Sequence, residues 1–319
     1  RLVLKKEGKI IKEYAIKELQ DLIISNKCGS ISIALLEELI QNGTQVHFVD
    51  YKEEPFVTFY TPALHGSVKG RREQLLSYYD ERGVQFVKEA VSSKTHNQIN
   101  TLKYFLKNRE SEKFLEIKED IEKMKNYIIE ISRIRGKNVD EIRQEALSIE
   151  AHAAKIYWKG ISLLLENYVD FPGRKPRSND PVNMMLDYGY AILRARASSS
   201  IIRAGLEPYA GFLHVDRSGR FSLVLDFMEI FRPSVIDRAV VSLITKGHIP
   251  ATETKEDGTS FLHPSTLQLL RTSIMKRLEK REEYEGKDYM MKTIIQHQTR
   301  LLASFFKGMQ KFKGYVSRW

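Results

Sequence analysis

The chain has 319 residues and a formal net charge of +10, from 51 lysines and arginines against 41 aspartates and glutamates. This balance favours a polyanionic partner, because each neutralised phosphate releases a counterion, although solubility alone would also explain it. The single cysteine, Cys28, excludes an intramolecular disulfide and a cysteine-based zinc site, and with neither an apolar span nor a signal peptide we expect a soluble cytoplasmic protein without membrane association.

The first 65 residues predict a small β domain that contains one helix. Strands are expected at residues 2–4, 10–11, 45–49 and 56–60, with a turn at 7–9, and a helix is expected at 33–40. Asn42-Gly43 is a typical end for that helix. Exposed strand edges make such a domain a natural dimerisation surface, so we expect a homodimer formed through residues 1–65.

Helical periodicity follows this domain. Between Pro62 and Pro172 there is no proline, which is typical of helices and rare in turn-rich β structure. Helices are expected over residues 117–131, 149–165, 181–202, 221–230, 267–278 and 290–306. The predicted fold class is therefore α+β: a β domain at 1–65, a linker at 66–84 and a larger all-α catalytic domain at 85–319.

A few acidic residues and one histidine stand out in the helical part. Glu150 lies among small and apolar neighbours, and a carboxylate there needs either a metal or a basic partner. Asp226 and Glu229 are spaced i, i+3, so a helix would place them on one face, where they need a cation or a shared proton. A metal site and a salt bridge from Glu229 to Arg232 both remain open.

Histidine could complete a metal site with these carboxylates. Among eight histidines, His214 is the best ligand candidate, because it precedes the acidic pair by little more than ten residues. His152 is second, because its offset of two residues from Glu150 would point it away from that side chain in a helix.

Four ordered segments resemble the motifs of a known family, the CRISPR-associated nuclease-integrases of spacer acquisition. The segments are residues 150–158 (EAHAAKIYW), 179–190 (NDPVNMMLDYGY), 205–214 (GLEPYAGFLH) and 226–233 (DFMEIFRP), and the resemblance covers essentially the whole chain. It implies that Glu150, His214 and Glu229 bind a metal. It also implies that Asp226 is a second carboxylate beside the metal and that Asn183 is a polar residue supporting the site.

The resemblance implies a reaction and its partners. The mixed histidine and carboxylate set suits Mn²⁺ or Mg²⁺, which would polarise a phosphodiester for attack by water or by a DNA 3′-hydroxyl. The substrate would be double-stranded DNA, branched or with 3′ single-stranded ends, and the resemblance adds a small ferredoxin-like adaptation partner. A plain metal-dependent nuclease and a non-catalytic DNA-binding scaffold remain alternatives.

Basic residues indicate where DNA could approach. They are Arg174, Lys175 and Arg177 in a loop before the second motif, and Arg194, Arg196 and Arg203 on the helix that follows. The C-terminal residues 306–319 alternate lysine and arginine with aromatic rings, a pattern that suits phosphate contacts with base stacking if the tail is ordered.

Overall fold

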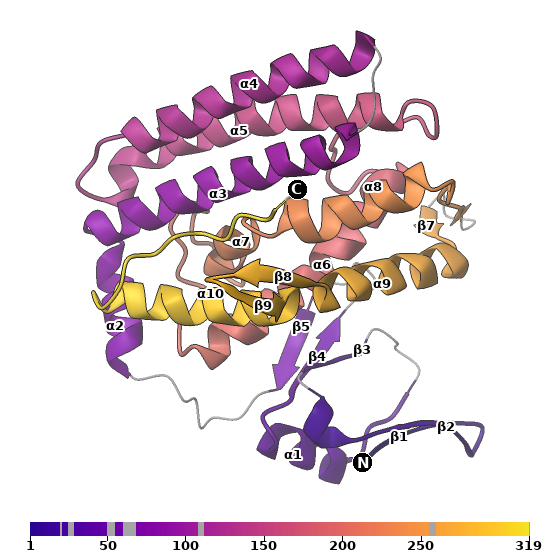
Figure 1. Ribbon diagram of the computed structural model, residues 1–319. Helices are drawn as coiled ribbons and strands as arrows, with labels where there is room; N and C mark the ends of the chain where they lie inside the picture. Colours follow the sequence, from indigo (N-terminus) through magenta and orange to yellow (C-terminus); the bar gives the residue numbers. More distant parts are fainter. Residues whose placement is uncertain are drawn as a thin grey trace. The chain divides into compact units, whose positions relative to one another are not determined.

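The computed structural model describes residues 1–19, 21–24, 29–49, 55–59, 68–107, 112–254 and 260–318. Cys28 and Trp319 lie outside these described residues. The chain splits into two compact units, Arg1–His65 and Gly66–Trp319 (Figure 1). Within the described ranges, no helix is both long enough and apolar enough to cross a membrane.

The first unit is a small β structure with one α-helix, as predicted. Its elements are β1 (Leu2–Lys6), β2 (Lys9–Tyr14), the short 3-10 helix η1 (Ile16–Glu18), β3 (Asp21–Ile24), α1 (Ile33–Gln41), β4 (Gln45–Val49) and β5 (Pro55–Phe59). Strands β1 and β2 form an antiparallel hairpin, and Glu7 and Gly8 at its turn both have positive φ, as a tight two-residue turn requires. Strand β4 pairs parallel with β3 and antiparallel with β5.

Capping residues define both ends of helix α1. The Ser32 hydroxyl accepts from Leu35 N at 3.2 Å at its start, and the Asn42 amide donates to Glu38 O at 2.7 Å at its end. Gly43 then takes a φ of +76°, which ends the helix. The helix buries Leu39 against Val46 of β4 in a core of its own unit.

The second unit is predominantly helical, which confirms the predicted fold class. Its elements are α2 (Val68–Ser77), α3 (Glu81–Leu106), α4 (Glu112–Arg133), α5 (Val139–Leu165), α6 (Pro181–Arg203), α7 (Ser222–Met228), the π-helical turn η2 (Arg232–Asp237), α8 (Arg238–Thr245), β6 (Thr252–Thr254), β7 (Ser260–Leu262), α9 (Pro264–Glu279), β8 (Arg281–Tyr284), β9 (Lys287–Met290) and α10 (Met291–Phe306). The long helices α3, α4 and α5 lie side by side (Figure 1).

Two features of this unit differ from the prediction. It is not all-α, because β6–β7 and β8–β9 form short antiparallel hairpins. The second hairpin turns at Glu285-Gly286, where both residues have positive φ, a turn signal that the helical periodicity on either side obscured. The expected linker at 66–84 contains α2 and the start of α3, and α2 belongs to this unit because the Gln74 amide donates to Glu207 O and Ala210 O at 2.9 and 3.0 Å.

The C-terminal segment is packed into the core. Phe312 and Tyr315 are 6% and 3% exposed, and Asn97 of α3 donates to Tyr315 O at 2.9 Å. These rings stabilise the helical unit by burying apolar area, so they are not presented to bases in the way the alternating sequence suggested.

Candidate functional site

Two predicted carboxylates from distant parts of the chain meet at one buried cation, and that cation is a lysine. Glu150 lies in α5, and Glu229 caps the C-terminal end of α7. Lys94 of α3 pairs directly with Glu150 Oε1, and its Nζ lies 2.6 Å from Glu229 Oε2. Arg232 Nη1 lies 2.6 Å from the other oxygen, Glu229 Oε1. The structure therefore brings Glu150 and Glu229 together and gives both basic partners.

The pKa values of these groups favour their charged forms. Burial opposes the charge on Glu229, but Arg232, Lys94 and His214 outweigh it and lower its pKa from 4.5 to about 2. Burial likewise opposes the charge on Lys94, but Glu229 and Glu150 raise its pKa above the ordinary value.

Helix α3 presents a polar face to the segment that carries Glu229. Lys94, Asn97 and Thr101 follow one another at spacings of three and four residues, so they share one side of the helix. Asn97 Nδ2 donates to Ile230 O at 2.7 Å, and Thr101 Oγ1 donates to Pro233 O at 3.1 Å. Lys94 was not selected from the sequence, because α3 carries many other polar side chains and no pattern distinguishes this one.

Asp226 holds the loop of His214 rather than facing Glu150 and Glu229. Its Oδ2 accepts from Phe212 N at 2.6 Å and from Leu213 N at 3.0 Å. Its Oδ1 accepts from His214 N at 2.9 Å and lies 2.6 Å from His214 Nδ1. Because this geometry makes Nδ1 the donor, the neutral ring presents Nε2 as its acceptor, the atom that would bind a metal.

Other elements fix the same loop from outside. Arg143 of α5 donates to Phe212 O at 3.1 Å, and Gln74 of α2 bonds the chain at Glu207 and Ala210. At Gly211, a Cβ atom would lie 2.5 Å from the Ser222 Cβ and 3.1 Å from Asp226 Oδ2, so only glycine allows this close approach.

Asn183 stabilises a neighbouring loop. Its Oδ1 accepts from Arg174 Nη1 at 2.9 Å and Lys175 N at 2.8 Å, and its Nδ2 donates to Gly173 O and Asp180 Oδ1, both at 3.0 Å. These four bonds use the full capacity of the amide, so Asn183 positions the 173–175 loop at the start of α6.

Tyr190 links that loop to the acidic pair. The guanidinium groups of Arg174 and Arg232 lie 5.3 and 4.6 Å from the centre of its ring. Its hydroxyl donates to Asp237 at 2.6 Å, and the Tyr157 hydroxyl donates to the second Asp237 oxygen at 2.9 Å. The Arg232 guanidinium, which pairs with Glu229, therefore packs on the Tyr190 ring, whose hydroxyl is hydrogen-bonded to Asp237.

The described residues contain no group of three His, Cys, Asp or Glu side chains already gathered as a metal site. The donor set nevertheless fits a hard divalent ion in its chemistry. Two carboxylates converge on one cation, and the buried Glu229 Oε2 receives no well-aligned hydrogen bond. His214 Nδ1 is engaged by Asp226, which leaves Nε2 as the nitrogen that could bind a metal. His152 lies elsewhere, with Nδ1 2.7 Å from Ser148 O and its ring stacked on Tyr127.

The basic residues divide into structural and exposed ones. Arg174 pairs with Asp187 and Asn183 and is 13% exposed in its side chain, whereas Lys175 and Arg177 are exposed. Arg194, Arg196 and Arg203 are half-buried on α6. Arg217, which was not selected from the sequence, is exposed three residues after His214.

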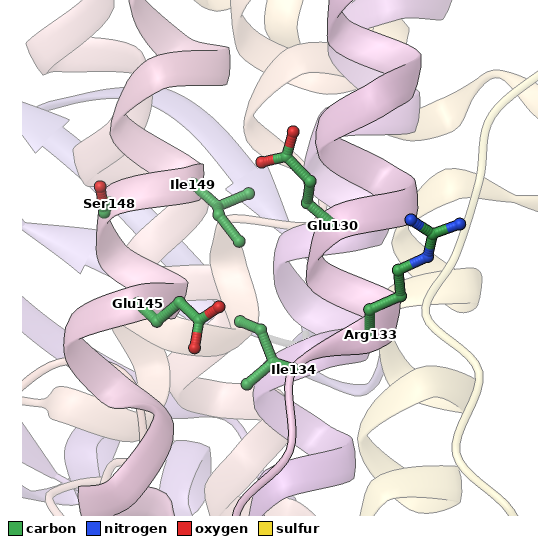
Figure 2. Close-up of a pocket in the computed structure, with 6 residues that line it drawn as sticks. All are labelled: Glu130, Arg133, Ile134, Glu145, Ser148 and Ile149. Carbon is green, nitrogen blue, oxygen red and sulfur yellow. The ribbon is translucent and has the colours of Figure 1, made fainter.

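A cavity of about 330 Å³ lies between α4 and α5, apart from these residues. Figure 2 shows its six lining residues, with Glu130 and Arg133 on α4, Ile134 just after it, and Glu145, Ser148 and Ile149 on α5. Its lining mixes both charge signs with apolar groups and includes none of the predicted site residues. The candidate site is therefore the Lys94, Glu150 and Glu229 cluster with the His214 loop.

Most of the chain matches one protein family, and its full length is similar to a known member of that family. Residues 1–276 match the family model described as CRISPR associated protein Cas1. The chain is 35% identical to "CRISPR-associated endonuclease Cas1 1" of Archaeoglobus fulgidus over 332 aligned positions, covering 100% of this chain and 95% of the relative.

Solved structures show the same fold. A casposase bound to an integration product matches with a TM-score of 0.80 at 23% identity, over 98% of this chain and 86% of the other. A chain of a structure described as a Cas6-RT-Cas1–Cas2 complex matches with a TM-score of 0.78 at 20% identity, over 98% of this chain and 34% of that one.

Proposed function

The chain belongs to the family of CRISPR-associated Cas1 proteins, and from that membership we propose that it is a divalent-metal-dependent DNA endonuclease and integrase of spacer acquisition in antiviral defence. In this reaction the 3′-hydroxyl of a short DNA fragment attacks a phosphodiester of the repeat array. The attacked phosphorus gains a bond to the incoming oxygen and loses its bond to the leaving 3′-oxygen of the array strand.

One observation carries the proposal: Glu150 and Glu229, from helices far apart in sequence, converge on a single buried cation. Two carboxylates so placed would repel without it. Together with His214, they are the residues that would hold Mn²⁺ or Mg²⁺. When bound, the metal would supply positive charge to the phosphodiester as negative charge develops on its oxygens.

The chain's own residues supply the rest of the site. Asp226 holds both the ring and the main chain of His214, so the ring and its Nε2 atom are fixed in orientation without rearrangement of that loop. Arg232 holds one oxygen of Glu229 and leaves the other to be shared. Exposed basic residues, including Lys175 and Arg217, lie in the loops that bear Asn183's partners and His214, where they would contact phosphates.

We further propose three kinds of partner. The formal charge of +10 suits duplex DNA, branched or with 3′ single-stranded ends. The similar structure described as a Cas6-RT-Cas1–Cas2 complex supports a partner of the Cas2 kind, which we propose to be the small ferredoxin-like partner. A homodimer through the first unit is supported by β2, which is exposed along its length and carries Ile10 and Ile11 at 57% and 62% exposure.

A strand-transfer assay tests the function. A labelled duplex with free 3′-hydroxyl ends is incubated with a repeat-containing target in Mn²⁺, beside the same duplex with 3′-deoxy ends. We expect joining only with the 3′-hydroxyl duplex, and no joining with Glu150→Gln. Cleavage without joining would make the protein a plain nuclease, and DNA binding with neither reaction would make it a scaffold.

A further inference from the structure

Glu229 has both of its oxygens occupied by cations of this chain. Arg232 Nη1 lies 2.6 Å from Oε1, and Lys94 Nζ lies 2.6 Å from Oε2 while also pairing with Glu150. All four side chains lie largely inside the protein, with Glu229 6%, Lys94 12%, Glu150 19% and Arg232 24% exposed. A divalent ion therefore cannot reach the shared oxygens unless one of the two cations withdraws.

The two cations differ in how firmly they are held. The Arg232 guanidinium lies over the Tyr190 ring, and Tyr190 is itself anchored to the buried Asp237. Lys94 ends a flexible four-carbon chain and, among the described residues, has no comparable second anchor beyond the two carboxylates. Lys94 is thus the cation that can leave.

The net charge of the cluster also indicates that Lys94 is the cation that leaves. Glu150 and Glu229 carry two negative charges, and Lys94 and Arg232 carry two positive ones, so the cluster is neutral as it stands. Adding a divalent ion with all four in place would leave a charge of +2 in a buried site, with the ammonium beside the metal. Moving the ammonium toward solvent relieves that repulsion.

We propose that Lys94 is a resident counter-ion that competes with the divalent metal for Glu150 and Glu229, so that metal binding is an exchange in which the Lys94 ammonium leaves the space between the two carboxylates. This inference rests on the proposed metal site. Its consequence is that the metal-free protein keeps both carboxylates paired and stays folded, and that the strength of the Lys94 contacts sets how much metal is needed to load the site.

The test measures metal binding rather than catalysis. Mn²⁺ is titrated into the full-length wild type, Lys94→Met and Lys88→Met, by calorimetry and by the electron paramagnetic resonance of free Mn²⁺. Lys88 is the matched control, because it lies six residues earlier in α3 and its Nζ bonds only the main chain, at Ile134 O. We expect Lys94→Met to bind Mn²⁺ about 10- to 100-fold more tightly than wild type, the range that a lost charge-assisted hydrogen bond represents, and Lys88→Met to match wild type.

A second readout follows from the same exchange. Metal-free Lys94→Met should unfold at a lower temperature than wild type, because two carboxylates are left facing each other, and Mn²⁺ should raise its melting temperature more than it raises that of wild type. Lys94→Gln, which is neutral but can still donate a hydrogen bond, serves if the methionine variant does not fold.

The outcomes separate the inference from the function on which it rests. Equal or weaker Mn²⁺ binding by the neutral Lys94 variants would overturn the exchange while leaving the metal site intact. The proposed metal site itself fails if wild type binds no Mn²⁺, or if Glu150→Gln binds as much Mn²⁺ as wild type.

Discussion

His214 Nδ1 lies 2.6 Å from Asp226 Oδ1, and the same oxygen accepts a hydrogen bond from the main-chain N–H of His214. One carboxylate thus fixes both the ring and the backbone of the candidate ligand. The second oxygen of Asp226 accepts from the two preceding main-chain N–H groups. Asp226 is 1% exposed, so water cannot replace these bonds if the carboxylate is removed.

Asp226→Ala should therefore act mainly on stability. It leaves three main-chain N–H groups without an acceptor in a buried loop, and we expect the free energy of unfolding to fall by about 3–5 kcal/mol. His214→Ala removes only the ring and should cost about 1 kcal/mol while weakening Mn²⁺ binding. Urea unfolding of both variants checks this, and similar small losses would show that Asp226 does not hold the loop.

The proposed metal ligands should respond differently from Asp226. Glu150→Gln, Glu229→Gln and His214→Ala should each reduce cleavage and strand transfer to background, because a three-ligand site loses geometry when one ligand goes. Glu229→Gln should also lower the free energy of unfolding by about 3–5 kcal/mol, since Lys94 and Arg232 lose a buried partner. Activity near wild type in folded Glu150→Gln would remove Glu150 from the site.

Local signals predicted most of the fold. The caps of α1, the hairpin turn at Glu7-Gly8 and the periodic helices all depend on residues close in sequence. The hairpin β8–β9 was missed because strands of four residues are too short to show a clear apolar period.

The site was predictable only in part. Glu150, His214 and Glu229 could be selected by residue type and by resemblance, and the basic partner foreseen for Glu229 is indeed Arg232. The pairing of Lys94 with Glu150 spans 56 positions, so only the packing of α3 against α5 reveals it. The role of Asp226 was also hidden, because three of its four contacts are with main-chain N–H groups, which leave no trace in side-chain identity.

The buried Asp237 should make stability depend on pH. Burial raises the pKa of Asp237 from 3.8 to about 6, although Tyr190, Tyr157 and Arg232 oppose this shift. The folded protein then keeps a proton that the unfolded chain has released, so this contribution to stability is full below about pH 4 and is lost as the pH rises through about 6.

Comparison with Asp237→Asn isolates that contribution. The advantage of wild type over Asp237→Asn in the free energy of unfolding should shrink by about 3 kcal/mol between pH 4 and pH 7, the equivalent of a shift of about two pKa units. Urea unfolding at four pH values across this range measures it. A difference that does not change with pH would mean that Asp237 does not titrate there.

Substitutions at two adjacent basic residues should distinguish a DNA contact from a structural role. Lys175 is exposed, so Lys175→Gln should leave stability unchanged and reduce the salt dependence of DNA binding by about one unit of slope. Arg174 is committed to Asp187 and Asn183, so Arg174→Gln should instead destabilise the 173–175 loop. Binding titrations at several salt concentrations, paired with thermal unfolding, distinguish the two. Identical effects of both substitutions would contradict this division.

Asn97 ties the C-terminal segment to the segment that carries Glu229. Its Nδ2 donates to Ile230 O at 2.7 Å and to Tyr315 O at 2.9 Å, and its Oδ1 accepts from Ser317 N at 2.7 Å. Asn97→Ala leaves all three main-chain groups buried and unpaired, so we expect a loss of about 3–5 kcal/mol and faster hydrogen exchange at the Ser317 amide. Asn100→Ala, one turn later in α3, breaks only the bond to Ser317 O and should cost about 1 kcal/mol. If both variants lose the same small amount, the segment after α10 is held by its buried rings, and Asn97 is not what couples it to Glu229.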